Sequence, residues 1–132
     1  MTVAEIKNRV MFQTNNDTDD LNDFLPYLLG YINEGYDRLA YAYAGMHLSG
    51  TGTDEYHTLT SDTDVPAIPV RYHPAIADFA TWLVYRNGNI QKQNRGAAFL
   101  RSFEEYLAQI RNEGGAVGEE NGKPRNFFNI PR

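Results

Sequence analysis

The chain has 132 residues and a mass of 15.0 kDa, which is enough for one domain with a single hydrophobic core. Hydrophobic residues make up 42% of it, yet no apolar run approaches the roughly 20 residues that span a bilayer, so no membrane partner is expected. The lack of cysteine excludes a disulfide scaffold and a cysteine-ligated zinc site, and the net charge of −5 argues against a protein that coats nucleic acid.

A short helix is predicted at the N-terminus. Thr2 and Glu5 have the spacing of a capping box, in which each side chain bonds the backbone N–H of the other residue. Apolar residues then recur at helical spacing: Val3, Ile6 and Val10. The acidic run at 17–23 follows, and it offers several N-caps for the next helix.

The clearest apolar stripe predicts one continuous helix from Leu21 to Tyr43, about 35 Å long. Pro26 is tolerated because it falls in or near the first turn. Glu34 and Arg38 form an i,i+4 pair in the favourable order. They belong to a flank beside the stripe that is rich in tyrosine: Tyr27, Tyr31, Glu34, Arg38 and Tyr41.

A long loop is predicted at 45–70, where glycine, serine, threonine and aspartate break the helical pattern. Tyr56 to Thr60 has strand-like residues that suit one arm of a hairpin. Pro66 and Pro69 keep the exit of the loop extended. A loop of this length indicates function or disorder, and we expect it to be mobile in the free chain and to order on assembly.

Two further helices are predicted in the second half of the chain. His73 and Pro74 start the first of them, since proline is favoured at the first helical position, and 87–89 ends it in a tight turn. The last helix runs from about Ile90 to Asn112, and Gly96 within it permits close approach of another backbone.

These patterns predict an all-α fold: a small bundle of about four helices in residues 1–113, with a long loop between the second and third helices. Residues 114–132 are expected to form an extended, flexible C-terminal tail. Its end is apolar, which favours docking on the chain's own body or on a partner, with a disordered tail as the alternative. The candidate docking residues are Arg125, Phe127, Phe128, Ile130 and Arg132.

The charge is unevenly divided along the chain. Residues 1–70 hold eleven acids and three bases, a net charge of −8, whereas residues 71–132 hold six acids and nine bases, a net charge of +3. Two interpretations of this division are open. In the first, the two halves pack together within one chain or their charges are simply solvated. In the second, the acidic face of one copy contacts the basic face of the next copy. The last arrangement is a head-to-tail contact, which closes into a ring when the rotation allows.

No motif for catalysis, metal binding or a cofactor emerges. The acidic run starting at Asp17 fails the EF-hand pattern, because its fifth and sixth positions are Leu21 and Asn22. Gly50-Thr-Gly-Thr lacks the lysine of a P-loop, and His47, His57 and His73 have no metal-ligand spacing. We expect neither an enzyme nor a cofactor, although a carboxylate pair of the glycosidase type stays open.

A helical DNA-binding regulator is the alternative from another class. Basic residues line parts of the last helix, and a short turn joins it to the helix before, as in a helix-turn-helix: Lys92, Arg95, Arg101 and Arg111. The overall acidity of the chain weighs against this interpretation.

Three segments resemble the small head–tail connector, or adaptor, proteins of tailed bacteriophages. The stretch Ile68–Asn89, IPVRYHPAIADFATWLVYRNGN, is similar to a family segment in which P-x-x-[FY]-H leads into a helix with an aromatic-rich end. Ala97–Leu107, AAFLRSFEEYL, resembles the Ala-Ala-x-x-x-x-Phe helix that follows, and Tyr31–Tyr36, YINEGY, resembles the family's second helix.

The resemblance implies a structural virion protein, made in the host cytoplasm, that forms a ring beneath the portal protein. In that family the ring is commonly twelvefold, extends the DNA channel without sequence-specific binding, and offers a platform to tail, stopper or nozzle proteins. Another neck or tail-completion protein of the virion is the alternative within this class. We take the tyrosine flank and two arginines as the subunit interface, since tyrosine and arginine are favoured at interfaces: Tyr27, Tyr31, Glu34, Arg38, Tyr41, Arg95 and Arg101.

Overall fold

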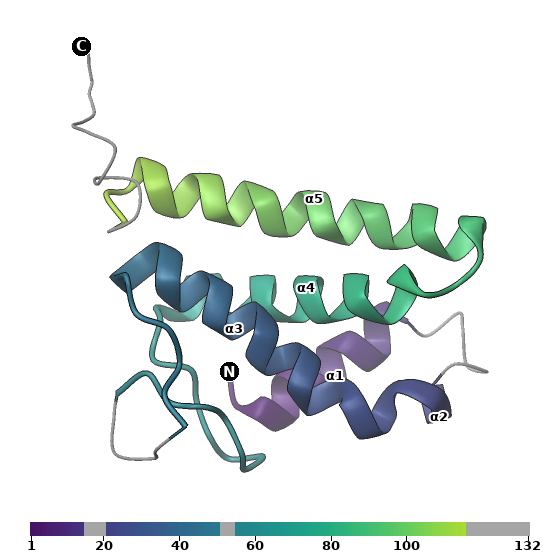
Figure 1. Cartoon of the computed structure of the whole chain (residues 1–132), viewed down its shortest axis with the longest axis horizontal. Helices are drawn as coiled ribbons and strands as arrows, with labels where there is room; N and C mark the ends of the chain where they lie inside the picture. Colours follow the sequence, from purple (N-terminus) through teal and green to yellow (C-terminus); the bar gives the residue numbers. More distant parts are fainter. Residues whose placement is uncertain (15–20, 51–54, 116–132) are drawn as a thin grey trace.

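The protein is an all-α bundle in the computed structural model, which describes residues 1–14, 21–50 and 55–115. The long helices are α1 (Val3–Gln13), α3 (Leu28–Ala44), α4 (His73–Arg86) and α5 (Ile90–Asn112). The shorter ones are α2 (Leu21–Phe24) and two 3₁₀ helices, η2 (Leu25–Tyr27) and η3 (Val70–Tyr72). This architecture, drawn in Figure 1, confirms the predicted fold class.

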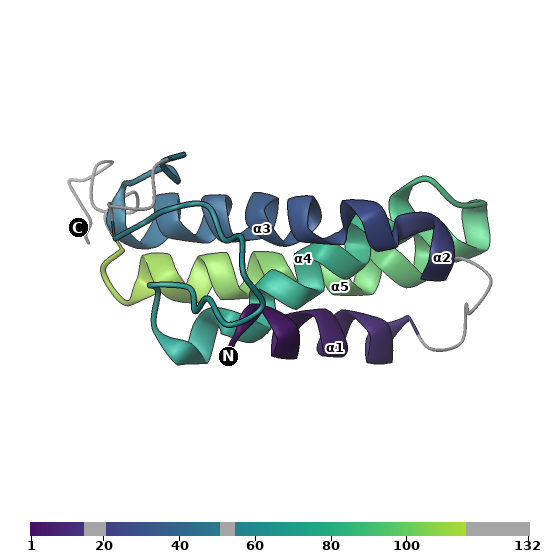
Figure 2. The ribbon, with the colours of Figure 1, turned by 90° about the horizontal axis from the view of Figure 1, so that it is seen from below.

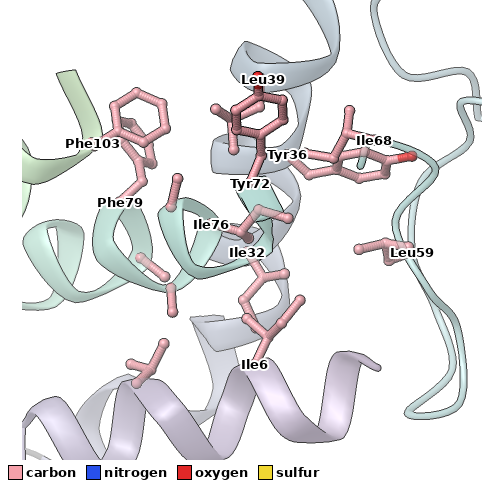
Figure 3. Close-up of a cluster of buried hydrophobic side chains, with 14 of the residues drawn as sticks. Ile6, Ile32, Tyr36, Leu39, Leu59, Ile68, Tyr72, Ile76, Phe79 and Phe103 are labelled. Carbon is pink, nitrogen blue, oxygen red and sulfur yellow. The ribbon is translucent and has the colours of Figure 1, made fainter. Parts of the chain in front are cut away.

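Helix α4 is the centre of the bundle. It packs against α1, α3 and α5, and Figure 2 shows α3 and α1 on opposite sides of it. Every residue from Ala75 to Thr81 is buried, which is typical of a helix covered on all sides. Figure 3 shows how Ile76 of this helix meets Ile32 of α3 and Ile6 of α1 in the core.

The ends of the helices follow the local signals in the sequence. Thr2 Oγ1 accepts a hydrogen bond from Glu5 N–H (3.2 Å), while Glu5 Oε1 accepts one from Thr2 N–H (2.8 Å), so the predicted capping box is confirmed. Asn89 caps α5 in the same way, because its Oδ1 accepts a hydrogen bond from Lys92 N–H (3.0 Å). Helices α4 and α5 begin at His73 and Ile90, as predicted.

The prediction of one continuous helix from Leu21 to Tyr43 is wrong. The chain forms α2, then the 3₁₀ turn η2 with Pro26 inside it, and only then α3. Proline has no N–H to donate and its ring crowds the preceding turn, so the tighter 3₁₀ geometry takes over at this point.

The described part of the 45–70 loop packs against the helices. Leu59 and Ile68 are buried in the core, and Figure 3 shows both beside Tyr36 of α3. The described residues hold no strand and no hairpin, and an isolated parallel bridge joins Ser49 to His57. The predicted hairpin arm at 56–60 therefore forms no strand, and Leu59 and Ile68 belong to the core of the single chain. The expected mobility of the loop in the free chain stays a prediction.

The described chain ends on the bundle. The N–H of Gly115 donates to the carbonyl of Ile110 (2.9 Å), and Gly115 is buried, so the helical body includes two residues that the sequence assigned to the tail. The hydroxyl of Tyr72 and the guanidinium of Arg71 both donate to Glu113, and these hydrogen bonds hold the pKa of Glu113 below its usual value.

Candidate functional site

A groove of about 620 Å³ lies between α3 and α5, with α4 beneath it. Its wall is mainly aromatic and aliphatic: Phe79 and Trp82 from α4, and Leu100, Phe103 and Leu107 from α5. Phe79 and Phe103 form its deepest part, with ring centroids 4.7 Å apart, and Figure 3 shows the two rings side by side. Trp82, Leu100 and Leu107 are only half-buried, so the groove presents apolar surface to solvent.

Charged side chains surround this apolar wall: Glu34, Asp37, Arg38, Arg86, Glu104 and Arg111. Two of the arginines lie over aromatic rings, Arg38 at 5.1 Å from the centroid of Phe79 and Arg86 at 5.4 Å from that of Trp82. Arg38 also lies 3.8 Å from Glu34, which confirms that the predicted i,i+4 pair is in place.

The start of the long loop is tied to one side of the groove. Asp37 of α3 accepts a hydrogen bond from Leu48 N–H (2.8 Å), and its other carboxylate oxygen lies 3.1 Å from Nδ1 of His47. The His47 ring stacks on Tyr41, with centroids 4.5 Å apart and planes 11° apart. Asp37 thus holds His47 and Leu48 at the groove's edge, where the His47 ring covers Tyr41.

The structure divides the predicted interface residues among three places. Glu34, Arg38 and Tyr41 line the groove. Tyr27 and Tyr31 lie in a smaller hollow against the α4–α5 turn, where their rings stack at 6.4 Å. Arg95 and Arg101 are exposed on α5 and line neither hollow. The predicted docking residues of the tail, Arg125, Phe127, Phe128, Ile130 and Arg132, lie outside the described residues.

Sequence reasoning missed the opposite wall of the groove. Trp82 was available as a signal, since it is the single tryptophan of the chain and lies three residues after Phe79 on the same face of α4. Glu104 and Arg111 lie on the groove-facing side of α5 together with Leu100 and Leu107. Their roles depend on where α3 passes, which no local pattern specifies.

Exposed apolar side chains gather at both ends of the bundle. At one end, here called the turn end, they come from the last turn of α1, from η2 and from the start of α5: Phe12 (76% exposed), Leu25, Tyr27 (61%) and Ile90 (72%). Figures 1 and 2 show the last turn of α1, helix α2 and the start of α5 at the same end of the bundle. At the opposite end, here called the exit end, they come from the end of α3, from the loop just after it and from the start of η3: Tyr43, Met46 (51%) and Val70 (67%).

The three Lys and Arg ion pairs described here each lie within one half of the sequence and do not join the acidic half to the basic half. Lys7 pairs with Asp62 (2.9 Å) within residues 1–70, and Arg71 pairs with Glu113 (3.1 Å) within residues 71–132. The Glu34–Arg38 pair also lies within the first half. These pairs therefore leave the charge difference between the two halves in place.

The last two helices do not have helix-turn-helix geometry. Helices α4 and α5 run antiparallel along most of their length, as Figure 1 shows, whereas the DNA-binding motif crosses two short helices at about 90–120°. The alternative of a DNA-binding regulator gains no support from this arrangement.

Within the described ranges, no three His, Asp or Glu side chains converge as a metal site, and no helix combines the length and apolar character needed to cross a membrane. Comparisons of the chain with family models, with curated proteins and with solved structures find no match. The groove and the two apolar ends are the features on which a function can be argued.

Proposed function

We propose that this chain is a structural protein of a tailed bacteriophage, a head–tail connector that forms a ring under the portal. The ring extends the DNA channel and docks tail or stopper proteins. Support comes from the resemblance of Ile68–Asn89 and Ala97–Leu107 to adaptor proteins, and from the order of helices that accompanies it.

The exposure of apolar side chains at both ends of the bundle carries the proposal. Phe12 and Ile90 at the turn end, and Met46 and Val70 at the exit end, are each more than half exposed in the single chain. Burying a large apolar side chain is worth about 1.5–3 kcal/mol, so contacts at both ends favour association. A subunit with exposed apolar side chains at two opposite ends can contact two other proteins at once. These are proteins on either side of the ring plane, or neighbouring copies within the ring.

The proposed partners are those that the resemblance to adaptor proteins implies. Identical copies surround a common axis, the portal protein lies on one side, and a tail, stopper or nozzle protein lies on the other. The net charge of −5 suits a channel through which DNA slides without being held, because like charges repel the phosphates. The tail at 123–132 is the proposed docking element toward the portal or a neighbouring subunit.

Imaging of purified particles tests the proposal. We expect a closed ring of this chain between the portal and the tail. Particles that lack the chain, or that hold it as a solitary subunit, contradict the proposal. A ring located elsewhere in the neck identifies the chain as the other kind of neck or tail-completion protein.

A matched pair of variants tests the apolar ends. Phe12→Ser removes the most exposed apolar side chain of the turn end, so we expect fewer tailed particles at unchanged yield of the folded chain. Asn8→Ser on the exposed face of the same helix is the control, and we expect normal assembly from it. Equal particle yields from the two variants count against a role of this end in assembly.

A further inference from the structure

The described chain ends beside the groove between α3 and α5. A Cβ atom added at Gly115 would lie 2.7 Å from the carbonyl oxygen of Ala42, and Ala42 is one of the groove residues. Arg111, which lies in the last turn of α5, lines the groove as well. The described chain therefore ends where the last turns of α3 and α5 meet.

The apolar content of the segment that follows, residues 116–132, suits the groove. Its large apolar residues are Phe127, Phe128 and Ile130. The groove offers the half-buried surfaces of Trp82 and Leu100 around two buried phenylalanine rings. Aromatic rings gain from offset or edge-to-face contacts with one another, so the two surfaces are complementary.

Charges of both signs line the groove. Arg111 is closest to the point where the chain leaves, and Glu104 lies two turns farther along α5, with Asp37 and Glu34 on the facing helix. Among the described residues, neither Arg111 nor Glu104 belongs to an ion pair. The groove beyond Arg111 thus holds three carboxylates and two arginines, Arg38 and Arg86, and Arg38 is paired with Glu34.

The segment between the exit and the phenylalanines carries its acids before its bases. Glu119 and Glu120 come first after the exit, and Lys123 and Arg125 follow before the phenylalanines. A segment that turns back along the groove brings its acids to Arg111 first, and its bases then come within reach of Glu104, which belongs to no ion pair among the described residues. Charges of opposite sign are therefore available along this path, with Arg111 at its start and Glu104 farther on.

The distance is within reach of the chain. Arg111 and Leu100 are eleven residues apart on α5, which corresponds to about 16 Å along the helix. The twelve residues from Gly115 to Phe127 span up to about 40 Å when extended. The segment therefore reaches the apolar wall with slack.

We infer that residues 123–132 dock in the groove of their own chain, with Phe127 and Phe128 on its apolar wall. Because the segment is tethered, its effective concentration at the groove is high, and weak contacts suffice to keep it bound much of the time. This inference does not depend on the proposed phage function. If the chain is a connector, the groove covers the apolar end of the tail until a partner takes it.

Trp82 makes the test direct, since it is the only tryptophan and lies in the groove. We compare quenching of its fluorescence by acrylamide, an uncharged quencher, in the full-length chain and in the full-length double variant Phe127→Ala, Phe128→Ala. A docked tail shields the ring, so we expect the quenching constant to rise roughly twofold in the variant. The double variant Asn126→Ala, Asn129→Ala changes the same stretch without removing apolar surface and is expected to quench like the parent.

A second pair of variants tests the groove side. Glu104→Lys replaces a negative charge in the groove with a positive one, whereas Glu105→Lys makes the same change at an exposed position outside the groove. Both leave the core untouched, so both chains fold. We expect Glu104→Lys to raise the quenching constant toward that of the Phe127→Ala, Phe128→Ala chain, and Glu105→Lys to leave it unchanged.

Two results overturn the inference. One is equal quenching in the parent, the phenylalanine variant and Glu104→Lys, which means that the tail does not cover Trp82. The other is shielding that grows with protein concentration, which means that the groove takes the tail of a second copy. Shielding that is independent of concentration and lost in both variants supports docking within one chain.

Discussion

Asn33 of α3 and Leu59 of the long loop are joined by two hydrogen bonds. The Asn33 amide donates to the carbonyl of Leu59 (3.0 Å), and the N–H of Leu59 donates to the side-chain oxygen of Asn33 (2.8 Å). The loop segment is thus held by a side chain that serves both backbone groups of one residue. Its position puts the Leu59 side chain into the core.

Replacing Asn33 should loosen the loop while leaving the helices in place. Asn33→Ala leaves the backbone N–H and carbonyl of Leu59 partly buried without partners, so we expect the free energy of unfolding to fall by about 1–3 kcal/mol. The amide of Leu59 should also exchange faster with solvent. Urea denaturation and hydrogen exchange check both effects. Asn94→Ala, on the exposed side of α5, is the control and should change the free energy by less than about 0.5 kcal/mol.

The contact between Asn33 and Leu59 is an example of a feature that the sequence did not predict, in contrast to the bounds of the helices. The bounds of α4 and α5 depend on nearby residues, Pro74 at the helix start and Asn89 as a cap, so they were predictable. The packing of Leu59 depends on Asn33, 26 residues earlier, and such a pairing leaves no periodic signal in the sequence. A loop rich in glycine and threonine therefore suggested mobility, although its described part supplies core residues.

The candidate site divides in the same way. Glu34, Arg38 and Tyr41 share one flank of a helix, so their spacing grouped them correctly. The facing residues Trp82 and Glu104 belong to other helices, and they meet the flank only because α3 and α5 diverge over α4. The angle between packed helices depends on the whole set of contacting side chains, which a local pattern does not contain.

A buried polar cluster joins α1, α4 and α5. Asp78 of α4 accepts hydrogen bonds from the amide of Gln13 (2.9 Å) and from the hydroxyl of Ser102 (2.7 Å). Thr81 donates to the side-chain oxygen of Gln13 (2.6 Å) and is itself fully buried. Each polar group thus has a partner, and the cluster fixes how the three helices are aligned.

Removing the carboxylate from this cluster should be costly. In Asp78→Ala the donors on Gln13 and Ser102 lose their common acceptor, so we expect the free energy of unfolding to fall by about 2–4 kcal/mol. Ser102→Ala removes one donor and should cost about 1–2 kcal/mol. Thermal and urea denaturation measure both changes, and Glu105→Ala on the exposed face of α5 should fall within about 0.5 kcal/mol of the parent. A value for Asp78→Ala near that of Glu105→Ala would show that the cluster contributes little.

His73 is fully buried at the start of α4 and is held by two partners. The N-terminal ammonium group of Met1 donates to its Nδ1 (2.8 Å), so Nε2 carries the hydrogen that is donated to the carbonyl of Ile68 (2.8 Å). The ring is therefore neutral in the fold. Burial is the main reason that the pKa of His73 lies below the usual value of 6.5, and the positive charge of the ammonium group lowers it further.

Stability should consequently fall as the solution becomes mildly acidic. Below about pH 6.5 the histidine of the unfolded chain takes up a proton that the folded chain resists, so acidification favours unfolding. We expect the free energy of unfolding to be level just above this pH and to decline below it, with a slope approaching about 1.4 kcal/mol per pH unit. Urea titrations at a series of pH values measure the slope. His73→Gln should flatten the decline and His57→Gln should keep it; a decline unchanged in His73→Gln assigns the effect to other groups.

Close contact between α4 and α5 depends on Gly96. A Cβ atom built at this position would lie 2.7 Å from the Cβ of Tyr85, closer than real Cβ atoms approach. Gly30 on α3 is the natural comparison, because it is also helical, is exposed, and has no atom within 4 Å of an added Cβ.

The two glycines should respond to alanine with opposite signs. Gly96→Ala forces the two helices apart at the contact with Tyr85, so we expect the free energy of unfolding to fall by about 1–3 kcal/mol, despite the better helix propensity of alanine. Gly30→Ala meets no neighbour and gains that propensity, so we expect a rise of about 0.5–1 kcal/mol. Urea denaturation of the two variants and the parent gives both differences under one set of conditions. Stabilisation by both substitutions would mean that α4 and α5 lie farther apart at this point than the contact between Gly96 and Tyr85 requires.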